Sequence, residues 1–321
     1  MTWGIHVGRL AVCLLLVLSL NFALPRLMPG DPVLMVLGPD SVALSHLDYE
    51  ALRREYGLDR PVWEQFGRYW MELASFRLGY SYFYRRSVGE LIWEHLGRTL
   101  CLVVPAVFLS TIIAAVFGTI AGWKRGSILD LSLTALALLA YAMPAFLTAM
   151  ILLDACSIRH HGFSSPALAP DPDAVTAALK RFFRWLRHTV LPITVLTVTS
   201  AGAKYLVMRK AVAATRDEPH VFYARARGLS WSRVVFAHVF LKACLPLLHL
   251  SALHLGFVVS GAVLVEIVFS INGMGCLILD AVLRRDYPVL QGSFLVLTLV
   301  VLFMNALMDW ISALLDPRLR P

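Results

Sequence analysis

The chain has 321 residues, of which 58% are hydrophobic and 16% are charged, and its formal net charge is +8. Soluble domains average nearer half apolar and a quarter charged, so this composition argues against an ordinary soluble protein. The apolar residues also cluster in runs long enough to cross a hydrocarbon core, which predicts an all-α polytopic membrane protein with about six transmembrane helices. Because no nucleic-acid-binding motif accompanies the basic charge, we expect a lipid bilayer and no nucleic acid as its partner.

The N-terminal part of the chain is predicted to be a membrane anchor followed by a polar insert. Residues 10–24 form the first apolar run, and no small-residue cleavage site follows it. We therefore expect a retained anchor over residues 1–28. Residues 29–97 are polar and mixed, with an aromatic-rich part, RYWMELASFRLGYSYFY. They are expected to form an extracytoplasmic insert with short helices resting on the membrane surface.

The rest of the chain, residues 98–321, carries the other predicted spans. Gly118 and Gly122 have the GxxxG spacing that lets helices approach closely, and Pro144 should kink the third span. Residues 175–188 are amphipathic and cationic, which favours a helix lying in the membrane interface with Asp173 as its N-cap. The spans are expected at residues 99–123, 131–153, 189–208, 247–269 and 289–315.

The distribution of basic residues predicts which side of the membrane each loop faces. Between Lys204 and Lys242 there are eight Lys or Arg residues and two acids. The loop between the fourth and fifth spans is therefore expected in the cytoplasm, and six spans then place both termini there. The cationic segment 175–188 argues the other way, but the remaining segments agree with one another.

The loop after the fourth span contains a short predicted helix, with one residue that marks its start and one that marks its end. An acid, Asp217 or Glu218, followed by Pro219 marks a helix start. A helix of about nine residues should run to Arg227, and Gly228 stands where a glycine would turn the chain through positive φ. Ser230 can cap a second helix that begins SWSRVVFAHVF.

One side of this short helix is expected to carry Phe222, Tyr223 and Ala226, with Arg225 and Arg227 elsewhere. A helix so short is unstable alone and needs a surface to sit against. The residues leave two interpretations open. The loop could meet anionic lipid headgroups, or it could present the helix to a cytoplasmic protein.

A family resemblance bears on that choice. The pattern A-x-A-x-G-L-S, with a proline eighteen residues after its glycine, resembles the cytoplasmic loop of binding-protein-dependent ABC importer permeases. Here it consists of Ala224, Ala226, Gly228, Leu229, Ser230 and Pro246. Other segments resemble the dipeptide, oligopeptide and nickel branch, in family order: PGDPV (29–33), YGLDRPV (56–62), RLGYSY (77–82), KRGSILD (124–130), MPAF (143–146), VLPITVL (190–196), VEIVFSINGMG (265–275), AVLRRDYPVLQG (281–292) and ALLDPRLR (313–320).

The sequence departs from the family pattern at a few positions. Phe222 stands where the family often has a charged residue. Pro219 and His220 stand where an aspartate–tyrosine pair is common, and Ile271 and Asn272 replace a frequent tryptophan–proline pair.

The resemblance implies a permease subunit in the inner membrane, with residues 98–321 as its core and residues 209–245 as a coupling loop. It implies peptides as the substrate, with nickel or a metal chelate as the alternative. The implied partners are cytoplasmic ATPase subunits, a second homologous permease in a heterodimer and an extracytoplasmic substrate-binding protein. The implied ATPase-docking residues are Phe222, Tyr223, Ala224, Arg225, Ala226, Arg227, Gly228, Leu229, Ser230 and Pro246.

The sequence offers little for other classes of function. None of its five lysines follows a glycine, so it has no GxxxxGK[ST] phosphate loop, and it lacks HExxH and GxSxG. We expect no catalytic residue, cofactor or metal, and the five cysteines have no CxxC spacing. An ion-driven secondary transporter would need buried carboxylates in mid-span, of which the sequence offers few. Structural roles such as interhelical hydrogen bonds are favoured over metal binding for Asp154, His249, His254, Glu266, Asp309 and the run Arg159, His160 and His161.

Overall fold

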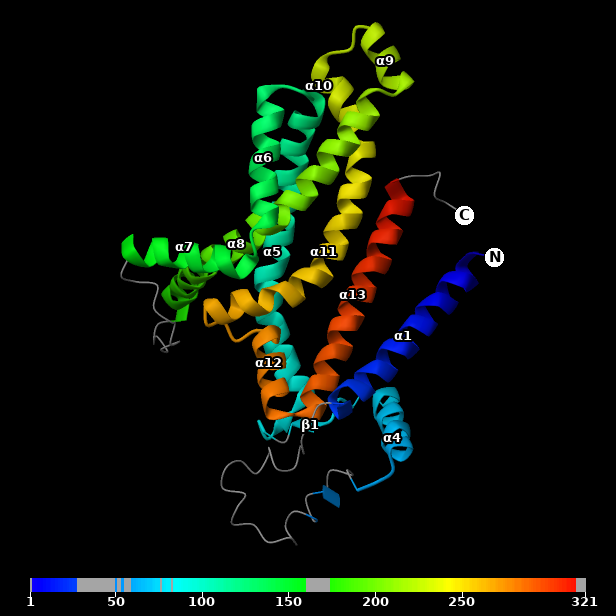
Figure 1. The fold of residues 1–321 in the computed structure, drawn as a ribbon, viewed down its shortest axis with the longest axis vertical. Helices are drawn as coiled ribbons and strands as arrows, with labels where there is room; N and C mark the ends of the chain where they lie inside the picture. The colour runs from blue at the N-terminus through cyan, green and yellow to red at the C-terminus, as the bar shows by residue number, and fades with distance from the viewer. Residues whose placement is uncertain are drawn as a thin grey trace. The chain divides into compact units, whose positions relative to one another are not determined.

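The structure is a computed structural model that describes residues 2–27, 50, 53–54, 59–75, 77–81, 83–159 and 174–315. Within these ranges the regular structure is helical apart from one short two-stranded sheet, so the predicted all-α class is confirmed (Figure 1). The chain divides into two compact units, described separately below. The first contains residues 1–98 and 272–300, and the second contains residues 99–271 and 301–320.

The first unit has a small aromatic core. Leu18, Phe22 and Tyr69 are buried together, and the Phe22 and Phe66 rings meet edge to face with their centroids 5.0 Å apart. Strand β1 pairs with β2 in antiparallel register, Tyr80 opposite Ser87. The elements of this unit are α1 (Thr2–Leu27), α4 (Val62–Ala74), β1 (Tyr80–Ser81), β2 (Arg86–Ser87), the first part of α5 (Val88–Trp123), α12 (Met274–Arg284) and the first part of α13 (Tyr287–Leu315).

Three polar contacts hold distant parts of the first unit together. Asn21 Nδ2 donates to the Tyr69 hydroxyl at 3.3 Å and to the Gln291 carbonyl at 2.7 Å, which joins α1 to α4 and α13. The Ser81 hydroxyl donates to Asp286 Oδ2 at 2.5 Å. Burial raises the pKa of the Asp286 carboxyl, although the Ser81 hydrogen bond opposes that shift.

The second unit is a helical bundle in which α8 packs against α6, α7 and α11. Close approach of α5 to α8 depends on two glycines. A Cβ at Gly118 would lie 2.7 Å from Met208 Cβ, and one at Gly122 would lie 2.6 Å from the Arg209 carbonyl oxygen, so the predicted small-residue contact is confirmed. The elements are the rest of α5, α6 (Ile128–Ala142), α7 (Ala145–Arg159), α8 (Ala174–Arg216), α9 (Pro219–Ala226), α10 (Trp231–Val234), a π-helical segment (Val235–Phe240), α11 (Leu241–Val268) and the rest of α13.

Among the residues that the structure describes, four helices are long and apolar enough to cross a membrane: Val88–Trp123, His188–Arg216, Trp231–Leu255 and Tyr287–Leu307. The pair α6 and α7 passes the same test as one span bent by 100°, and the bend falls at Pro144, as predicted. Among the described residues of α1, the apolar stretch Leu14–Ala23 is shorter than a span. The total of six spans therefore stays a prediction.

The boundaries of three predicted spans differ from the structure. The predicted fifth span, 247–269, lies in a helix that begins at Trp231 and continues through the π-helical segment and α11 to Val268. Helix α5 begins at Val88 rather than at residue 99, because the polar turns at its start continue the same backbone hydrogen bonding. Helix α8 begins at Ala174, so residues 175–188 continue directly into the predicted fourth span instead of forming a separate helix. A change in polarity does not by itself end a helix, and no glycine stop separates the two parts. The proposed N-cap Asp173 lies outside the described residues.

Candidate docking site

The site begins with the turn between α8 and α9. Glu218 is the N-cap residue of α9, Pro219 occupies the first helical position, and the Glu218 carbonyl accepts from Val221 N at 3.0 Å. The helix ends at Ala226 with Arg227 as its C-cap, close to the predicted length. A missing proline N–H costs nothing in the first turn, which explains why the helix starts here.

Gly228 ends α9 in the way that its sequence predicted. Its φ is +75°, and the Leu229 amide donates to the Ala224 carbonyl at 3.4 Å while the Gly228 amide donates to Arg225 O at 2.9 Å. This pair of bonds is the Schellman motif, which favours glycine at the left-handed position. Ser230 is the N-cap residue of α10, but its side chain makes no capping hydrogen bond, so that part of the prediction is wrong.

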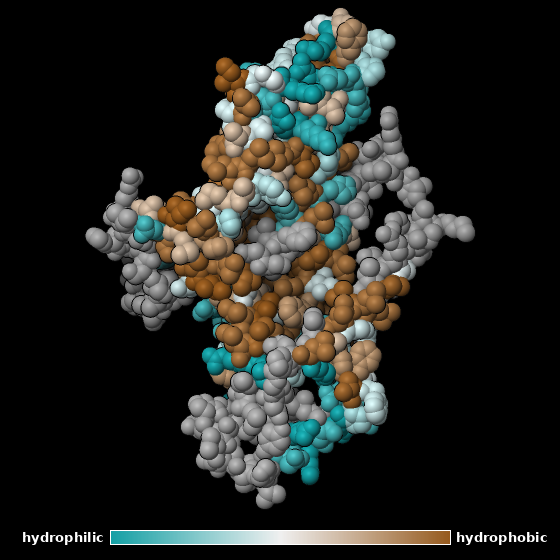
Figure 2. Space-filling view, in the orientation of Figure 1, coloured by the Kyte–Doolittle hydropathy of each residue, from teal (hydrophilic) through white to brown (hydrophobic). Residues whose placement is uncertain are grey.

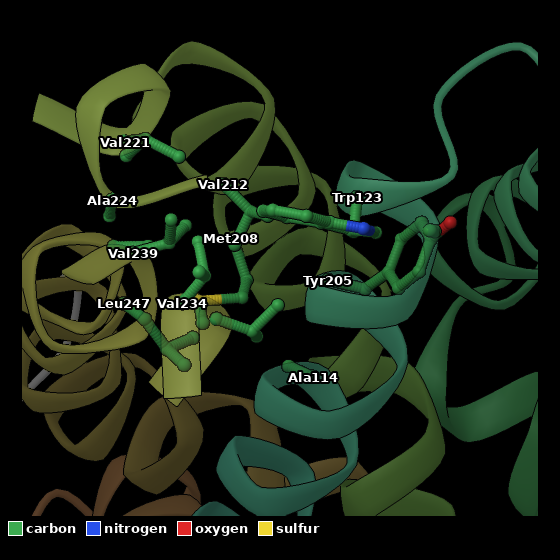
Figure 3. Packing of buried hydrophobic residues seen from close by; sticks show 13 residues of the cluster. Ala114, Trp123, Tyr205, Met208, Val212, Val221, Ala224, Val234, Val239 and Leu247 are labelled. Atoms are coloured by element: carbon green, nitrogen blue, oxygen red, sulfur yellow. The ribbon is translucent and has the colours of Figure 1, made fainter. Parts of the chain in front are cut away.

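The inner face of α9 is apolar and packs against the rest of the second unit. Val221 and Ala224 are buried in one cluster with Val212 of α8 and Val239 of the π-helical segment. Figure 3 shows Val221 and Ala224 reaching toward Val239 from the turns of α9. This contact supplies the surface that so short a helix needs.

The outer face of α9, defined as Phe222, Tyr223, Arg225, Ala226 and Arg227, is exposed. Phe222 is 69% exposed and Tyr223 is 67% exposed, and their rings lie 6.1 Å apart at 72°. Phe222, Tyr223 and Ala226 are all exposed, but Arg225 and Arg227 are exposed with them, so burial does not separate the arginines from the aromatic side as the sequence predicted. In Figure 2 the end of this unit that carries α9 and α10 is coloured mostly hydrophilic, next to largely hydrophobic helices. Exposed aromatic rings beside arginines are typical of protein interfaces.

Trp123, the last residue of α5, contacts α9 and helps to fix its position. Its side chain is buried, and its carbonyl accepts from Arg216 Nη1 at 2.5 Å. The guanidinium of Arg225 on α9 lies 5.2 Å from the centroid of the Trp123 ring. The Trp231 ring packs edge to face on the Trp123 ring, with the two centroids 6.4 Å apart. One indole thereby joins the end of α5 to α8, α9 and α10.

A polar cluster holds the N-terminal end of α9 in place. Lys242 Nζ lies 2.8 Å from Glu218 Oε2, and His220 Nδ1 lies 3.1 Å from the same oxygen. His220 Nε2 lies 3.2 Å from the His238 carbonyl, which can only accept, so the imidazole donates there. These contacts connect α9 to the π-helical segment and to the start of α11.

A partly buried ion pair joins α6 to α8. Asp130 accepts from Arg209 Nε at 2.5 Å and from Arg209 Nη2 at 2.8 Å, and it also accepts from the Gly126 amide at 3.0 Å. Such a bidentate pair fixes geometry as well as charge. It holds the turn between α5 and α6, which follows Trp123, against α8.

The structure brings most of the predicted docking residues together but separates one of them. Residues 222–230 form the outer part of α9 and the turn after it, whereas Pro246 lies inside α11. Sequence reasoning missed Trp123, because a tryptophan at the end of an apolar run is usually a membrane-interface anchor. It also counted Lys204 with the basic loop. The structure instead buries Lys204 completely inside α8.

The polar residues singled out from the sequence are only partly described. Glu266 is buried, and the Thr99 hydroxyl donates to its Oε1 at 2.6 Å, which is the interhelical hydrogen bond expected for it. His249 Nδ1 lies 3.0 Å from the Leu245 carbonyl in its own helix. Asp154 is exposed. His160, His161 and the side chains of Arg159 and Asp309 lie outside the described residues.

Comparison with known proteins decides the family. Residues 114–321 match the family described as binding-protein-dependent transport system inner membrane component. The chain belongs to this family. It is 35% identical over 317 residues, covering 97% of each chain, to a protein of Brucella suis biovar 1 (strain 1330) that is provisionally named a peptide permease. It is 31% identical over 317 residues, covering 94% of this chain and 93% of the other, to the dipeptide transport system permease protein DppB of Escherichia coli (strain K12).

Membership of the binding-protein-dependent permeases confirms the resemblance seen in the sequence. The chain is a multi-pass inner-membrane component of an ABC importer and is not itself the catalytic subunit. A permease of this kind works with ATPase subunits and with a substrate-binding protein. The matched residues include α9, Gly228 and the Asp130–Arg209 ion pair.

Proposed function

We propose that this chain forms the translocation pathway of an ATP-driven peptide importer and that α9 docks on its cytoplasmic ATPase. The observation that carries the docking proposal is the division of α9 into two faces. Val221 and Ala224 are buried against the bundle, while Phe222 and Tyr223 project outward. A helix held this firmly on its inner face presents its outer aromatic residues as a rigid anchor for a partner.

Force transmission follows from the way in which α9 is attached. Arg225 and Trp231 contact Trp123 at the end of α5, and Lys242 of α11 pairs with Glu218. Movement of the ATPase against α9 would therefore be passed to α5, α8 and α11 together. We infer that ATP-driven closure of the ATPase pair rocks these helices between inward-open and outward-open states.

Peptide is the proposed substrate because the relatives that cover nearly the whole chain carry peptide or dipeptide names. Nickel or a metal chelate is the alternative that the sequence left open, and the relatives do not favour it. We further propose cytoplasmic termini, a second homologous permease as the partner in a heterodimer, and an extracytoplasmic side for residues 29–97. In this arrangement residues 209–245 are the coupling loop.

The docking proposal is tested by co-purification of the ATPase with Phe222→Ala/Tyr223→Ala permease. We expect at least about a tenfold loss of ATPase association and the loss of ATP-dependent uptake, since removal of interface anchors costs about 2 kcal/mol or more. The matched control is Phe108→Ala, which removes a ring of similar exposure, 65%, from α5. Normal ATPase association in the double variant would overturn the proposal.

The class of transport is tested by uptake of a labelled dipeptide into cells with a controlled energy supply. We expect uptake to stop when ATP is depleted while the proton gradient is maintained. Uptake that continues under those conditions would show an ion-driven secondary transporter. Uptake of nickel in place of the dipeptide would transfer the assignment to the metal branch.

A further inference from the structure

Lys204 places an ammonium group in the interior of a predicted membrane span. It lies on α8 within the span His188–Arg216, and its side chain is fully buried. Its Nζ lies 2.7 Å from Ser110 Oγ, 3.2 Å from Thr111 Oγ1 and 3.2 Å from the Val107 carbonyl oxygen. All three partners belong to α5, and all three are neutral.

The buried acids of the same unit are engaged elsewhere. Asp130 is bonded to Arg209, and Glu266 accepts from Thr99. Thr99 and Val107 are eight residues apart on α5, which is roughly 12 Å along the helix axis. Within the described ranges no carboxylate therefore contacts the Lys204 ammonium.

A purely structural role does not explain the charge. Hydrogen bonds to two hydroxyls and a carbonyl could be made by a neutral glutamine, with no need to take a cation out of water. Ionisable groups inside membrane spans are costly, and they commonly mark the route of a transported solute. The positive charge of Lys204 is thus the feature that needs a ligand.

Further polar groups extend from Lys204 to a third helix. Thr111 Oγ1 lies 2.8 Å from Ser251 Oγ on α11. One turn further along α11, His254 has a buried Nδ1 with no hydrogen-bond partner among the described residues. Together α5, α8 and α11 supply an ammonium, rotatable hydroxyls and an imidazole, which are the donor groups that an anion requires.

We propose that Lys204 binds the carboxylate of the transported solute, which for a peptide is its C-terminal carboxylate. This inference rests on the proposed peptide-import function. Every linear peptide with a free C-terminus carries this group whatever its side chains, so one lysine can serve a range of sequences. The ammonium is enclosed in this conformation, and α5 must move away from α8 before a carboxylate can replace the Ser110 and Thr111 hydroxyls. Ligand contact and helix movement are thereby linked at one residue.

The test uses the purified permease–ATPase complex without the binding protein, so that selection by the binding protein does not enter. Its unfolding temperature is measured with dialanine and with dialanine amide, for the wild type and for Lys204→Gln, Lys204→Arg and Lys210→Gln. Lys210 is exposed on the same helix and serves as the control. Because each shift is measured against the same variant without ligand, a variant of altered stability still gives a result.

We expect dialanine to raise the unfolding temperature of the wild type, Lys204→Arg and Lys210→Gln, and the amide to have little effect. Lys204→Gln should lose the response to dialanine, with affinity falling by at least about tenfold. Equal shifts with acid and amide, no shift in the wild type, or an unchanged response in Lys204→Gln would each overturn the inference. ATP-dependent dialanine uptake by the complete wild-type importer reports separately on the proposed function.

Discussion

The Arg225 guanidinium lies 5.2 Å from the centroid of the Trp123 ring and so joins the proposed docking helix to the end of α5. Arg216 approaches the same ring at 5.6 Å and bonds the Trp123 carbonyl. Two arginines on one buried indole make this residue the common support of α8 and α9. Loss of the ring should therefore disturb coupling more than membrane insertion.

Trp123→Ala is expected to uncouple ATP hydrolysis from transport. Truncation of a buried tryptophan costs roughly 3–5 kcal/mol of stability, and here it removes the ring on which Arg225 of α9 packs. We expect the variant to reach the membrane with normal helicity but to transport poorly while ATP hydrolysis continues. Uptake per ATP hydrolysed in proteoliposomes measures this.

The matched control for Trp123→Ala is Trp93→Ala on the same helix. Trp93 is 79% exposed, so its removal should change the free energy of unfolding by only about 0.5 kcal/mol. If both variants transport alike, Trp123 has no special part in coupling.

Gly228 is expected to be replaceable by asparagine but not by valine. Its φ is +75°, and a Cβ there would meet no atom within 4 Å, so the cost of substitution is conformational rather than steric. Left-handed backbone costs a non-glycine residue about 1–2 kcal/mol, and asparagine tolerates it best. Gly228→Asn should keep ATPase association near the wild-type level, whereas Gly228→Val should weaken it.

Gly79→Val supplies the control, because Gly79 has a φ of +84° but belongs to the first unit, whereas α9 belongs to the second. It should lower stability by a similar amount and leave ATPase association intact. Equal loss of association in both valine variants would attribute the effect to general destabilisation.

Local signals in the sequence predicted the docking segment well. Pro219 and Gly228 act within a few residues of themselves, so their positions define the start and end of α9 whatever the rest of the chain does. Pro144 likewise breaks the third span by a local effect, the loss of a backbone donor and a steric clash. Such features need no knowledge of tertiary contacts.

Long-range features of the site could not be predicted in this way. The support of Arg225 by Trp123 joins residues about a hundred positions apart, and nothing near either residue indicates the other. Lys204 was included in the count of basic residues for the loop, although it lies within the predicted span 189–208. Its burial depends on where α5 packs.

Gly118→Ala is expected to destabilise the bundle, although alanine is the better helix former. The added Cβ would lie 2.7 Å from Met208 Cβ and 3.1 Å from the Arg209 amide nitrogen, so α5 and α8 must separate. Overpacking of this kind typically costs 1–3 kcal/mol. The unfolding temperature of the purified permease in detergent checks the expectation.

Gly97→Ala is the matched substitution, since Gly97 lies on the same helix and its added Cβ would meet nothing within 4 Å. There the gain in helix propensity, about 1 kcal/mol, should stabilise the protein. Opposite signs for the two variants support close packing of α5 on α8, and a stabilised Gly118→Ala variant would contradict it.

Asp286→Asn is expected to reduce the dependence of the free energy of unfolding on pH in the acid range. Burial raises the pKa of the Asp286 carboxyl in the folded protein, against the Ser81 hydrogen bond that lowers it. The folded state then binds more protons than the unfolded state between the two pKa values, so the free energy of unfolding falls as pH rises through that window. Below the window both states are protonated, and the contribution is fully present.

Unfolding midpoints in detergent, measured from acid to neutral pH, show whether this linkage operates. The wild type should lose stability as pH rises from the unfolded pKa to the raised folded pKa, and Asp286→Asn should not show that component. Asp280→Asn serves as the control, because Asp280 accepts from the Tyr84 hydroxyl at 3.2 Å in the same unit without being fully buried. Wild-type stability that rises with pH in this window would mean that hydrogen bonding to the Asp286 carboxylate outweighs its burial.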